Sequence, residues 1–273
     1  MKKALFIILY CILGAVFIYS AVHIAITLYG YHEADVLYEE LQEQYVTPNT
    51  PQSSGNTSRP NSSSHGSGYS DPGMLEDEEP APVRVNFEAL LETNNHVVGW
   101  LYCEGTPINY PVVQYKNNDY YLHRDINRKY LSSGTLFVDF RCGPLGTEQN
   151  HIIYGHNMRN STTMFGSLMN YKKQAYYDEH PVIYYLTPNG DYRIDLFAGY
   201  VTGADADVYF PSFGTADDFD AVLRYAIKRS TFKTDVTVTG EDHVVMLSTC
   251  STESNSARYV AFGKLVPLDI EEE

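Results

Sequence analysis

The segment PVIYYLTPNGDYRIDLFAGYVTG, residues 181–203, decides the fold. Two runs rich in Val, Ile, Tyr and Phe flank the sequence Pro188-Asn189-Gly190-Asp191. Asn-Gly between two strand-like runs is a strong signal for a tight hairpin turn. The segment therefore predicts a β-hairpin in the second half of the chain.

Six further runs of the same composition surround this hairpin. They are VVGWLYCEG, PINYPVVQY, GTLFVDFRC and HIIYG before it, and HVVMLST and ARYVAFGKLVPL after it. Helical patterns occur at 87–94, where Asn86 can cap the first turn, at 161–178 and at 215–229. Eight strands with few helices predict a mainly β domain. We expect a closed eight-stranded β-barrel with an N-terminal helical element and a helical insertion between late strands.

The composition changes upstream of this domain, which we place at residues 84–273. Residues 47–83 are rich in Ser, Asn, Pro and Gly and carry little apolar content, so they predict a disordered spacer. Residues 31–46 show the spacing of a short amphipathic helix. This order suggests a folded domain that works at some distance from whatever precedes the spacer.

The first 30 residues predict a cytoplasmic N-terminus and a transmembrane anchor. Residues 4–29 contain no Asp, Glu, Lys or Arg, and about 20 apolar residues suffice to cross a bilayer. A cleaved signal peptide is the alternative, but its apolar region spans only about 7–15 residues. Lys2 and Lys3 favour a cytoplasmic N-terminus. We therefore expect a single-pass protein of the cell membrane, in contact with lipid through residues 4–29, whose domain is extracellular.

The charge of the chain excludes one class of partner. The formal net charge is −15, with 19 Lys and Arg against 34 Asp and Glu among 273 residues. Nucleic-acid binding depends on clustered Lys and Arg, so no nucleic-acid partner is expected. The sequence also lacks a CxxC pair and a GxxxxGK[ST] phosphate loop.

Three cysteines lie outside the apolar run, and an odd number leaves at least one thiol free or bound to another molecule. Cys103 and Cys142 are expected to pack as buried strand residues, although a disulfide between them stays open. Cys250 differs, because it ends the apolar strand HVVMLSTC and precedes a polar loop. That position suits an exposed nucleophile, whereas a buried cysteine that packs as a small apolar side chain is the simpler alternative.

Two other residues stand at comparable strand ends. His156 follows the strand HIIYG and could act as an acid or a base, or it could be an ordinary surface histidine. Arg258 opens the last strand and could stabilise an oxyanion, or it could simply be solvated. Together with Cys250 they form a coherent set for acyl transfer, because a neighbouring cation favours the thiolate. The order His, Cys, Arg argues against a papain-like protease.

These motifs carry a family resemblance. YGHNM at 154–158, LSTC at 247–250 and RYVAFGKLV at 258–266 resemble the motifs of sortases, the cysteine transpeptidases of Gram-positive cell surfaces. GWLYCEGTPINYPVVQ and NNDYYLHRDI are similar to the class B branch. The resemblance covers roughly residues 84–268 and implies an eight-stranded barrel with His156, Cys250 and Arg258 as catalytic residues.

The resemblance implies a mechanism that agrees with these residue types. Cys250 would attack a Thr carbonyl in the C-terminal sorting motif of a surface protein, Arg258 would hold the oxyanion, and His156 would protonate the leaving amine. An amine of a peptidoglycan precursor, or alternatively of a pilin lysine, would then release the acyl-enzyme. Ser248 and Thr249 are expected to contact substrate. No cofactor and no metal are predicted.

One position departs from the family pattern. The usual TLxTC has Met246 in place of its first Thr, so we expect altered packing or substrate preference with the chemistry retained. Two rival interpretations remain: a cell-wall cysteine hydrolase that transfers its acyl group to water, and an anchored binding domain whose Cys250 is inert.

Overall fold

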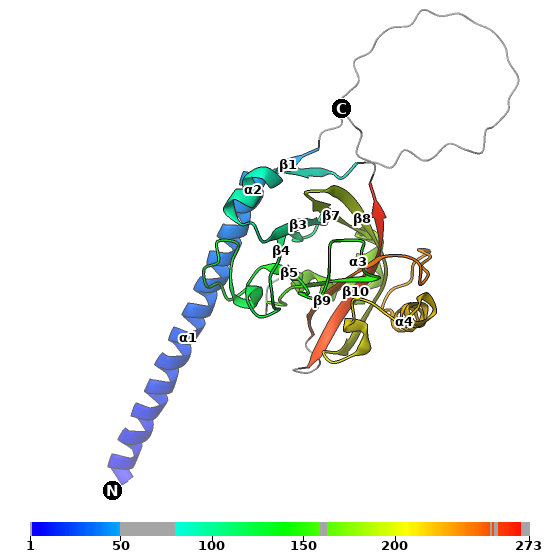
Figure 1. The fold of residues 1–273 in the computed structure, drawn as a ribbon. Coiled ribbons are helices and arrows are strands. Elements are labelled where there is room, and N and C mark those ends of the chain that lie inside the picture. Colours follow the sequence, from blue (N-terminus) through cyan, green and yellow to red (C-terminus); the bar gives the residue numbers. More distant parts are fainter. Residues whose placement is uncertain (1, 50–79, 159–162, 252, 254–255, 269–273) are drawn as a thin grey trace, which may run out of the picture.

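The computed structural model describes residues 2–49, 80–158, 163–251, 253 and 256–268. Within these residues the eight predicted strands form a closed barrel in the order β10-β8-β7-β3-β4-β5-β6-β9 (Figure 1). The expected barrel is therefore confirmed. Its strands are β3 (Val97–Tyr102), β4 (Asn109–Gln114), β5 (Leu136–Val138), β6 (Asn150–Tyr154), β7 (Val182–Thr187), β8 (Gly190–Gly203), β9 (Val244–Cys250) and β10 (Ala257–Pro267).

The predicted hairpin joins β7 to β8. Thr187 pairs with Gly190 across the turn, and Gly190 has a φ of 151°, a conformation that side-chain-bearing residues rarely adopt. The long strand β8 then pairs with β10 along most of its length. Two neighbouring pairs, β4 with β5 and β6 with β9, are parallel, which the local sequence pattern does not reveal.

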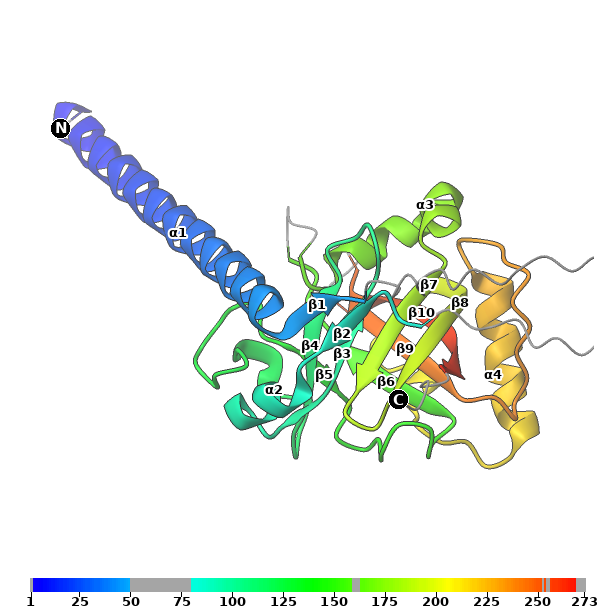
Figure 2. The same ribbon diagram turned by 90° about the horizontal axis from the view of Figure 1, so that it is seen from above.

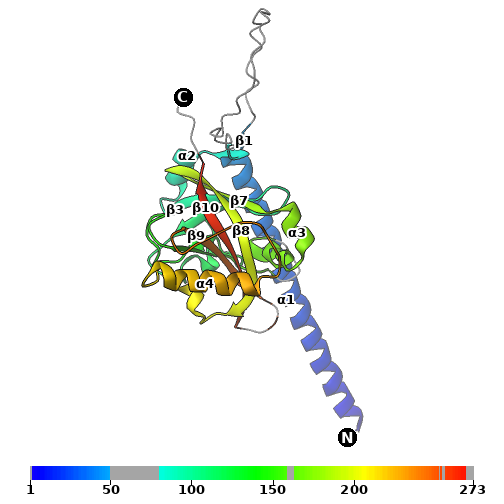
Figure 3. The same cartoon turned by 90° about the vertical axis from the view of Figure 1, so that its right-hand side faces the viewer.

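The helices at 87–94 and 215–229 are confirmed as α2 (Phe87–Thr93) and α4 (Ala216–Arg229). The Asn86 side chain accepts a hydrogen bond from the Ala89 amide and so caps α2. Thr215 caps α4 in the same way, and Phe219, Leu223 and Ala226 form its buried face. Figures 2 and 3 show α4 on the outside of the barrel, on the side away from α1.

The helical pattern at 161–178 is not one helix. Its described part comprises a 3₁₀ helix, η2 (Phe165–Lys172), and α3 (Gln174–Glu179). Phe165, Leu168 and Tyr171 are all fully buried, and their spacing of three residues matches the three residues per turn of a 3₁₀ helix. Tertiary packing therefore determines the helix type here. Two further 3₁₀ turns are η1 (Tyr121–His123) and η3 (Asp207–Tyr209).

A long N-terminal helix, α1 (Lys2–Tyr45), reaches the barrel domain with its C-terminal part, and its N-terminal part projects away from the domain (Figure 2). From Leu9 onward it is long and apolar enough to cross a membrane, and its most apolar window is not buried in the molecule. Its C-terminal part buries one face against the barrel domain, through Ala34, Tyr38, Leu41 and Tyr45. The residues predicted as an amphipathic helix thus continue directly from the apolar run.

Two short strands follow. β1 (Val46–Pro48) pairs antiparallel with β2 (Val83–Val85), so both ends of the predicted spacer lie side by side. Residues 50–79 of that spacer lie outside the described residues.

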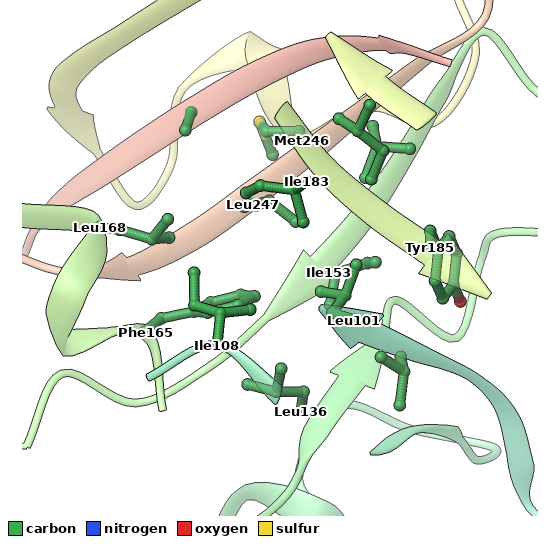
Figure 4. Packing of buried hydrophobic residues seen from close by; sticks show 14 of the residues in the cluster. Leu101, Ile108, Leu136, Ile153, Phe165, Leu168, Ile183, Tyr185, Met246 and Leu247 are labelled. Carbon is green, nitrogen blue, oxygen red and sulfur yellow. The ribbon is translucent and has the colours of Figure 1, made fainter. Parts of the chain in front are cut away.

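The barrel interior is filled by aliphatic and aromatic side chains from most of its strands. Figure 4 shows Leu101, Ile153 and Leu247 facing one another inside it, together with Phe165 and Leu168 from η2. All five are fully buried. This packing gives the strand ends a rigid support.

Candidate active site

Cys250 and Arg258 face each other at one end of the barrel. Cys250 ends β9, Arg258 is the second residue of β10, and the antiparallel register pairs the two directly. Directly opposed residues in such a pair have Cβ atoms about 4.5–5.5 Å apart. Cys250 is exposed, whereas Ser248 and Thr249 before it are buried. The thiol is thus presented to solvent with a cation beside it.

His156 reaches the same end from β6. Because β6 runs parallel to β9, both strands end at the same edge, and the Gly155 amide donates to the Ser248 carbonyl over 3.1 Å. Nε2 of His156 donates to the Leu122 carbonyl at 2.7 Å, since a carbonyl can only accept. Nδ1 therefore remains as the acceptor of the neutral ring, or as a second donor when the ring is charged.

The surroundings of His156 favour its neutral form. Burial lowers the pKa of His156, and the nearby His123 and Arg258 act in the same direction, whereas the Leu122 carbonyl raises it. The His123 ring stacks on it with centroids 5.4 Å apart. Because the net shift is downward from 6.5, the ring is mostly neutral at pH 7 and its Nδ1 can accept a proton.

A cavity of about 480 Å³ opens where these strand ends meet. His156, Cys250 and Arg258 all line it, so the structure brings the three predicted catalytic residues together. Ser248 and Thr249, the predicted substrate contacts, lie in the same wall. The remaining lining residues come from several separate loops and strands: Asn118, Leu122, Phe137, Arg141, Tyr154, Gly155, Ala204, Asp205, Ala206, Tyr209 and Phe210.

The two predicted substrate contacts have different surroundings. The Ser248 hydroxyl lies 2.9 Å from the Tyr209 hydroxyl, whereas the buried Thr249 hydroxyl has no hydrogen-bond partner within the described part of the chain. The Ser248 side chain is therefore already bonded to the cavity wall. The Thr249 side chain is available for a partner only if its surroundings open.

A hydrogen-bond network around the buried Asp139, which the sequence did not predict, holds Arg141 and Tyr154 in the cavity lining. The Asp139 carboxylate accepts from Arg141 Nε at 2.8 Å and Nη2 at 2.7 Å, and from the Tyr154 hydroxyl at 2.9 Å. Arg141 Nη2 also donates to the Tyr209 carbonyl over 2.8 Å. Burial alone would raise the pKa of Asp139, but these hydrogen bonds lower it overall. Asp139 thus holds Arg141 and Tyr154 in place as an anion.

Leu122 and His123 are the other residues that the sequence did not single out. Leu122 contributes its backbone carbonyl, which no side-chain pattern can reveal. His123 and His156 are far apart in sequence, so their stacking depends on the tertiary fold. The motif NNDYYLHRDI was noted only for its resemblance to class B sequences, and it contains both residues.

Three buried residues that the sequence singled out do not line this cavity. Met246 is fully buried between Phe262 of β10 and Ile152 of β6, so its place in the motif affects core packing. Cys103 and Cys142 are both buried free thiols, as expected, and form no disulfide, but they follow the ends of β3 and β5 and do not lie within strands.

Cys142, Glu148 and His151 form a buried group whose potential ligand atoms lie within 4.8 Å of one another. Glu148 bonds to His151 Nδ1 at 2.5 Å and to the Thr147 hydroxyl at 2.7 Å, whereas the buried His151 Nε2 has no hydrogen-bond partner among the described residues. Burial raises the pKa of Cys142 to about 12, so its thiol stays protonated. A protonated thiol is a poor metal ligand, and within the group Glu148 and His151 are paired with each other.

Comparisons with known proteins converge on one family. A sortase domain model matches residues 101–266. The chain is similar to sortase B of Staphylococcus aureus, with 33% identity over 71% of this chain and 80% of that protein. It is also similar to sortase B of Listeria monocytogenes, with 36% identity over 67% of this chain and 75% of that protein.

Solved structures agree. A Staphylococcus aureus sortase B–substrate complex superposes with a TM-score of 0.63 and 34% identity over 67% of this chain and 85% of that one. Sortase B from Bacillus anthracis, in complex with AAEK1, gives a TM-score of 0.67 and 29% identity over 88% and 99% of the two chains.

Proposed function

This chain belongs to the sortase family and to its class B, and from that membership we propose that it is a membrane-anchored cysteine transpeptidase with Cys250 as its nucleophile. The family supports cysteine transpeptidase activity. The finer proposal concerns which residues act, which polypeptides are cleaved and where the enzyme sits. The observation that best supports this finer proposal is that His156, Cys250 and Arg258 line one cavity.

The proposed first half-reaction cleaves a sorting motif after Thr. The Cys250 thiolate adds to the Thr carbonyl carbon, and Arg258 donates hydrogen bonds to the resulting oxyanion. When the C–N bond breaks, the departing amine takes a proton from Nδ1 of the His156 imidazolium. The products are a thioester on Cys250, a free amine and a neutral His156.

The second half-reaction reverses these proton movements. An amine of a cell-wall precursor attacks the thioester and gives its proton to Nδ1 of His156. The new amide forms, and Cys250 leaves as the thiolate. The surface protein is thereby joined to the cell wall, and the catalytic residues return to their starting states. Transfer to a pilin lysine or to water would use the same first half-reaction.

The Leu122 carbonyl supports this assignment. Its hydrogen bond to Nε2 holds the ring so that Nδ1 is the nitrogen that exchanges protons. The lowered pKa of His156 suits the step in which the ring acts as a base, because a neutral ring must be present to accept a proton.

Membrane attachment is the second part of the proposal. The apolar first part of α1 supports an anchor, and Lys2 and Lys3 favour a cytoplasmic N-terminus. The barrel would then be extracellular. Flotation of the full-length chain with vesicles, and protection of its N-terminus from added protease in sealed cells, test these two points.

Intact mass spectrometry tests the chemistry. The full-length protein in detergent is incubated with a panel of peptides that each contain a candidate sorting motif ending in Thr before the scissile bond. We expect an added mass equal to the acyl fragment, absent in Cys250→Ala and retained in Cys142→Ala, which removes a buried thiol. If peptide cleavage and adduct are both absent and Cys250 resists alkylation, the inert binding-domain alternative replaces the proposal.

An added amine separates transfer from hydrolysis. Triglycine serves as the acceptor, and the products are separated by mass. A peptide–triglycine conjugate supports transpeptidation, whereas release of free acid alone, at every acceptor concentration, supports the hydrolase.

A further inference from the structure

The helix α1 contacts the barrel domain along its last 16 residues. A Cβ on Gly30 would lie 3.3 Å from the Ser132 hydroxyl, and the Tyr38 hydroxyl donates to the Gly134 carbonyl. Farther along, Gln42 Nε2 donates to the Asn109 carbonyl at 2.9 Å. Contact with the domain therefore begins at Gly30, immediately after the apolar run that ends at Tyr29.

These contacts are specific enough to fix the direction of the helix. Tyr38 and Leu41 are almost fully buried, and the Tyr38 and Tyr110 rings pack edge to face with centroids 5.1 Å apart. The Tyr45 hydroxyl lies 2.7 Å from that of Thr93. Tyr29 to Tyr45 spans about 24 Å at 1.5 Å per residue, so α1 is held along a length comparable to a small domain.

The catalytic histidine is three contacts away from Gly30. Gly30 meets Ser132, the Ser132 carbonyl lies 3.4 Å from His123 Nδ1, and the His123 ring stacks on His156. Gly30, which follows the apolar run, is thus linked by a short chain of contacts to His156, which exchanges protons in the proposed reaction.

The catalytic end of the barrel also points toward the N-terminal part of α1. Figures 1 and 3 show β10 running away from the N-terminus of α1, so its first residues lie on the side of the apolar run. Ala257 pairs with Gly203, and Pro267 pairs with Tyr192. The β7–β8 turn at Asn189 therefore lies at the opposite end of the barrel.

The segment predicted as a spacer does not separate α1 from the barrel. The Asn49 amide donates to the Pro82 carbonyl at 2.8 Å, and Asn49 Nδ2 donates to the Ala81 carbonyl at 3.0 Å. With the β1–β2 pairing, these bonds bring residues 49 and 80 to one edge of the domain. The chain thus leaves the described domain after Asn49 and returns to it before Ala81 at the same edge, while α1 reaches the domain directly.

From these contacts we infer that α1 is a rigid strut that holds the catalytic end of the barrel against the headgroup layer of the bilayer. The inference rests on the anchoring part of the proposed function and is independent of the thioester chemistry. The partner surface is the membrane in which residues 4–29 are seated. The site then works at the membrane surface, and residues 50–79 contribute nothing to its height.

Headgroup quenching tests this geometry in the full-length chain. A fluorophore is attached to Asp205→Cys, beside the cavity, or to Asn189→Cys, in the β7–β8 turn; both positions are exposed. The background is Cys11→Ser with Cys250→Ala, since the other two cysteines are buried. The proteins are reconstituted in phosphatidylcholine vesicles containing a lipid with a spin label on its headgroup.

We expect strong quenching at position 205 and little at position 189, because β8 separates them by about 40 Å at roughly 3.3 Å per residue. Seven helix-forming residues inserted between Tyr29 and Gly30 lengthen α1 by about 10 Å with nearly unchanged phase, and should reduce quenching at 205. Replacement of residues 50–79 by Asn-Gly should leave both values unchanged.

Three results would overturn the inference: equal quenching at the two positions, no effect of the insertion, or loss of the difference when residues 50–79 are removed. Failure of the chain to float with the vesicles would overturn the anchor as well. Failure to form a thioester with peptides would affect only the proposed chemistry.

Discussion

Gly155 offers a sharp test of how the barrel positions His156. A Cβ at Gly155 would lie 2.4 Å from Leu136 Cδ2 and 2.6 Å from Phe165 Cδ2, and both neighbours are fully buried. Overpacking a core costs about 1–3 kcal/mol, and two buried neighbours place Gly155→Ala near about 3 kcal/mol. Relief of the clash must move the chain next to His156, and a shift of about 1 Å costs on the order of 10²-fold in rate.

Thermal unfolding and kcat/KM measure the two effects separately. For a domain of this size, 1 kcal/mol corresponds to roughly 2–4 °C, so we expect Gly155→Ala to lower Tm by about 6–12 °C. Gly214→Ala is the matched control, because its added Cβ meets only the Asp218 carboxylate at 3.1 Å on an exposed side chain that can rotate. A wild-type Tm for Gly155→Ala would refute the packing argument. Unchanged turnover would refute the link between Gly155 and His156.

Three further predictions concern charge. NMR titration should show a pKa for His156 below 6.5, because burial disfavours the charged ring. The unfolded chain then binds more protons than the folded chain just below pH 6.5, so His156 lowers the stability of the fold as pH falls through 6.5. A pKa above 6.5 would contradict the argument that burial favours the neutral ring. Asp139→Asn should cost about 1–3 kcal/mol in denaturant unfolding, because the half-exposed Arg141 and Tyr154 lose hydrogen bonds to a charged partner. It should also flatten the loss of stability that wild type shows in acid as Asp139 is protonated. Arg258→Lys should lower kcat/KM on the order of 10²-fold, because a point charge does not reproduce the planar fork, and a wild-type value would leave Arg258 only a charge role.

The strands could be predicted because their signals are local. Runs such as HVVMLSTC and the Asn-Gly turn identify themselves within a few residues, and all eight strands appear in the structure. The pairing of β6 with β9, and of β1 with β2, joins segments far apart in sequence, which no local pattern encodes. The 3₁₀ geometry of η2 was missed for the same reason, because it follows from packing inside the barrel.

The candidate site also contains residues that the sequence could identify and contacts that it could not. Cys250, His156 and Arg258 stand at strand ends beside polar loops, so residue type and position together pointed to them. The Leu122 carbonyl orients His156, and the buried Asp139 holds Arg141 and Tyr154 in the cavity lining. Such contacts arise only when distant segments fold together, and the sequence gives no spacing from which to infer them.

The order of strands around the barrel also has a consequence for biosynthesis. β9 and β10 close the gap between β6 and β8, and they comprise residues 244–267 near the end of the chain. Chains generally begin to fold from the N-terminus during synthesis, yet here the edges of β6 and β8 stay unpaired until these last strands emerge. Unpaired edges invite aggregation, and a chain without these last strands exposes two such edges. These last strands also carry Cys250 and Arg258, so an incompletely synthesised chain lacks two of the three proposed catalytic residues.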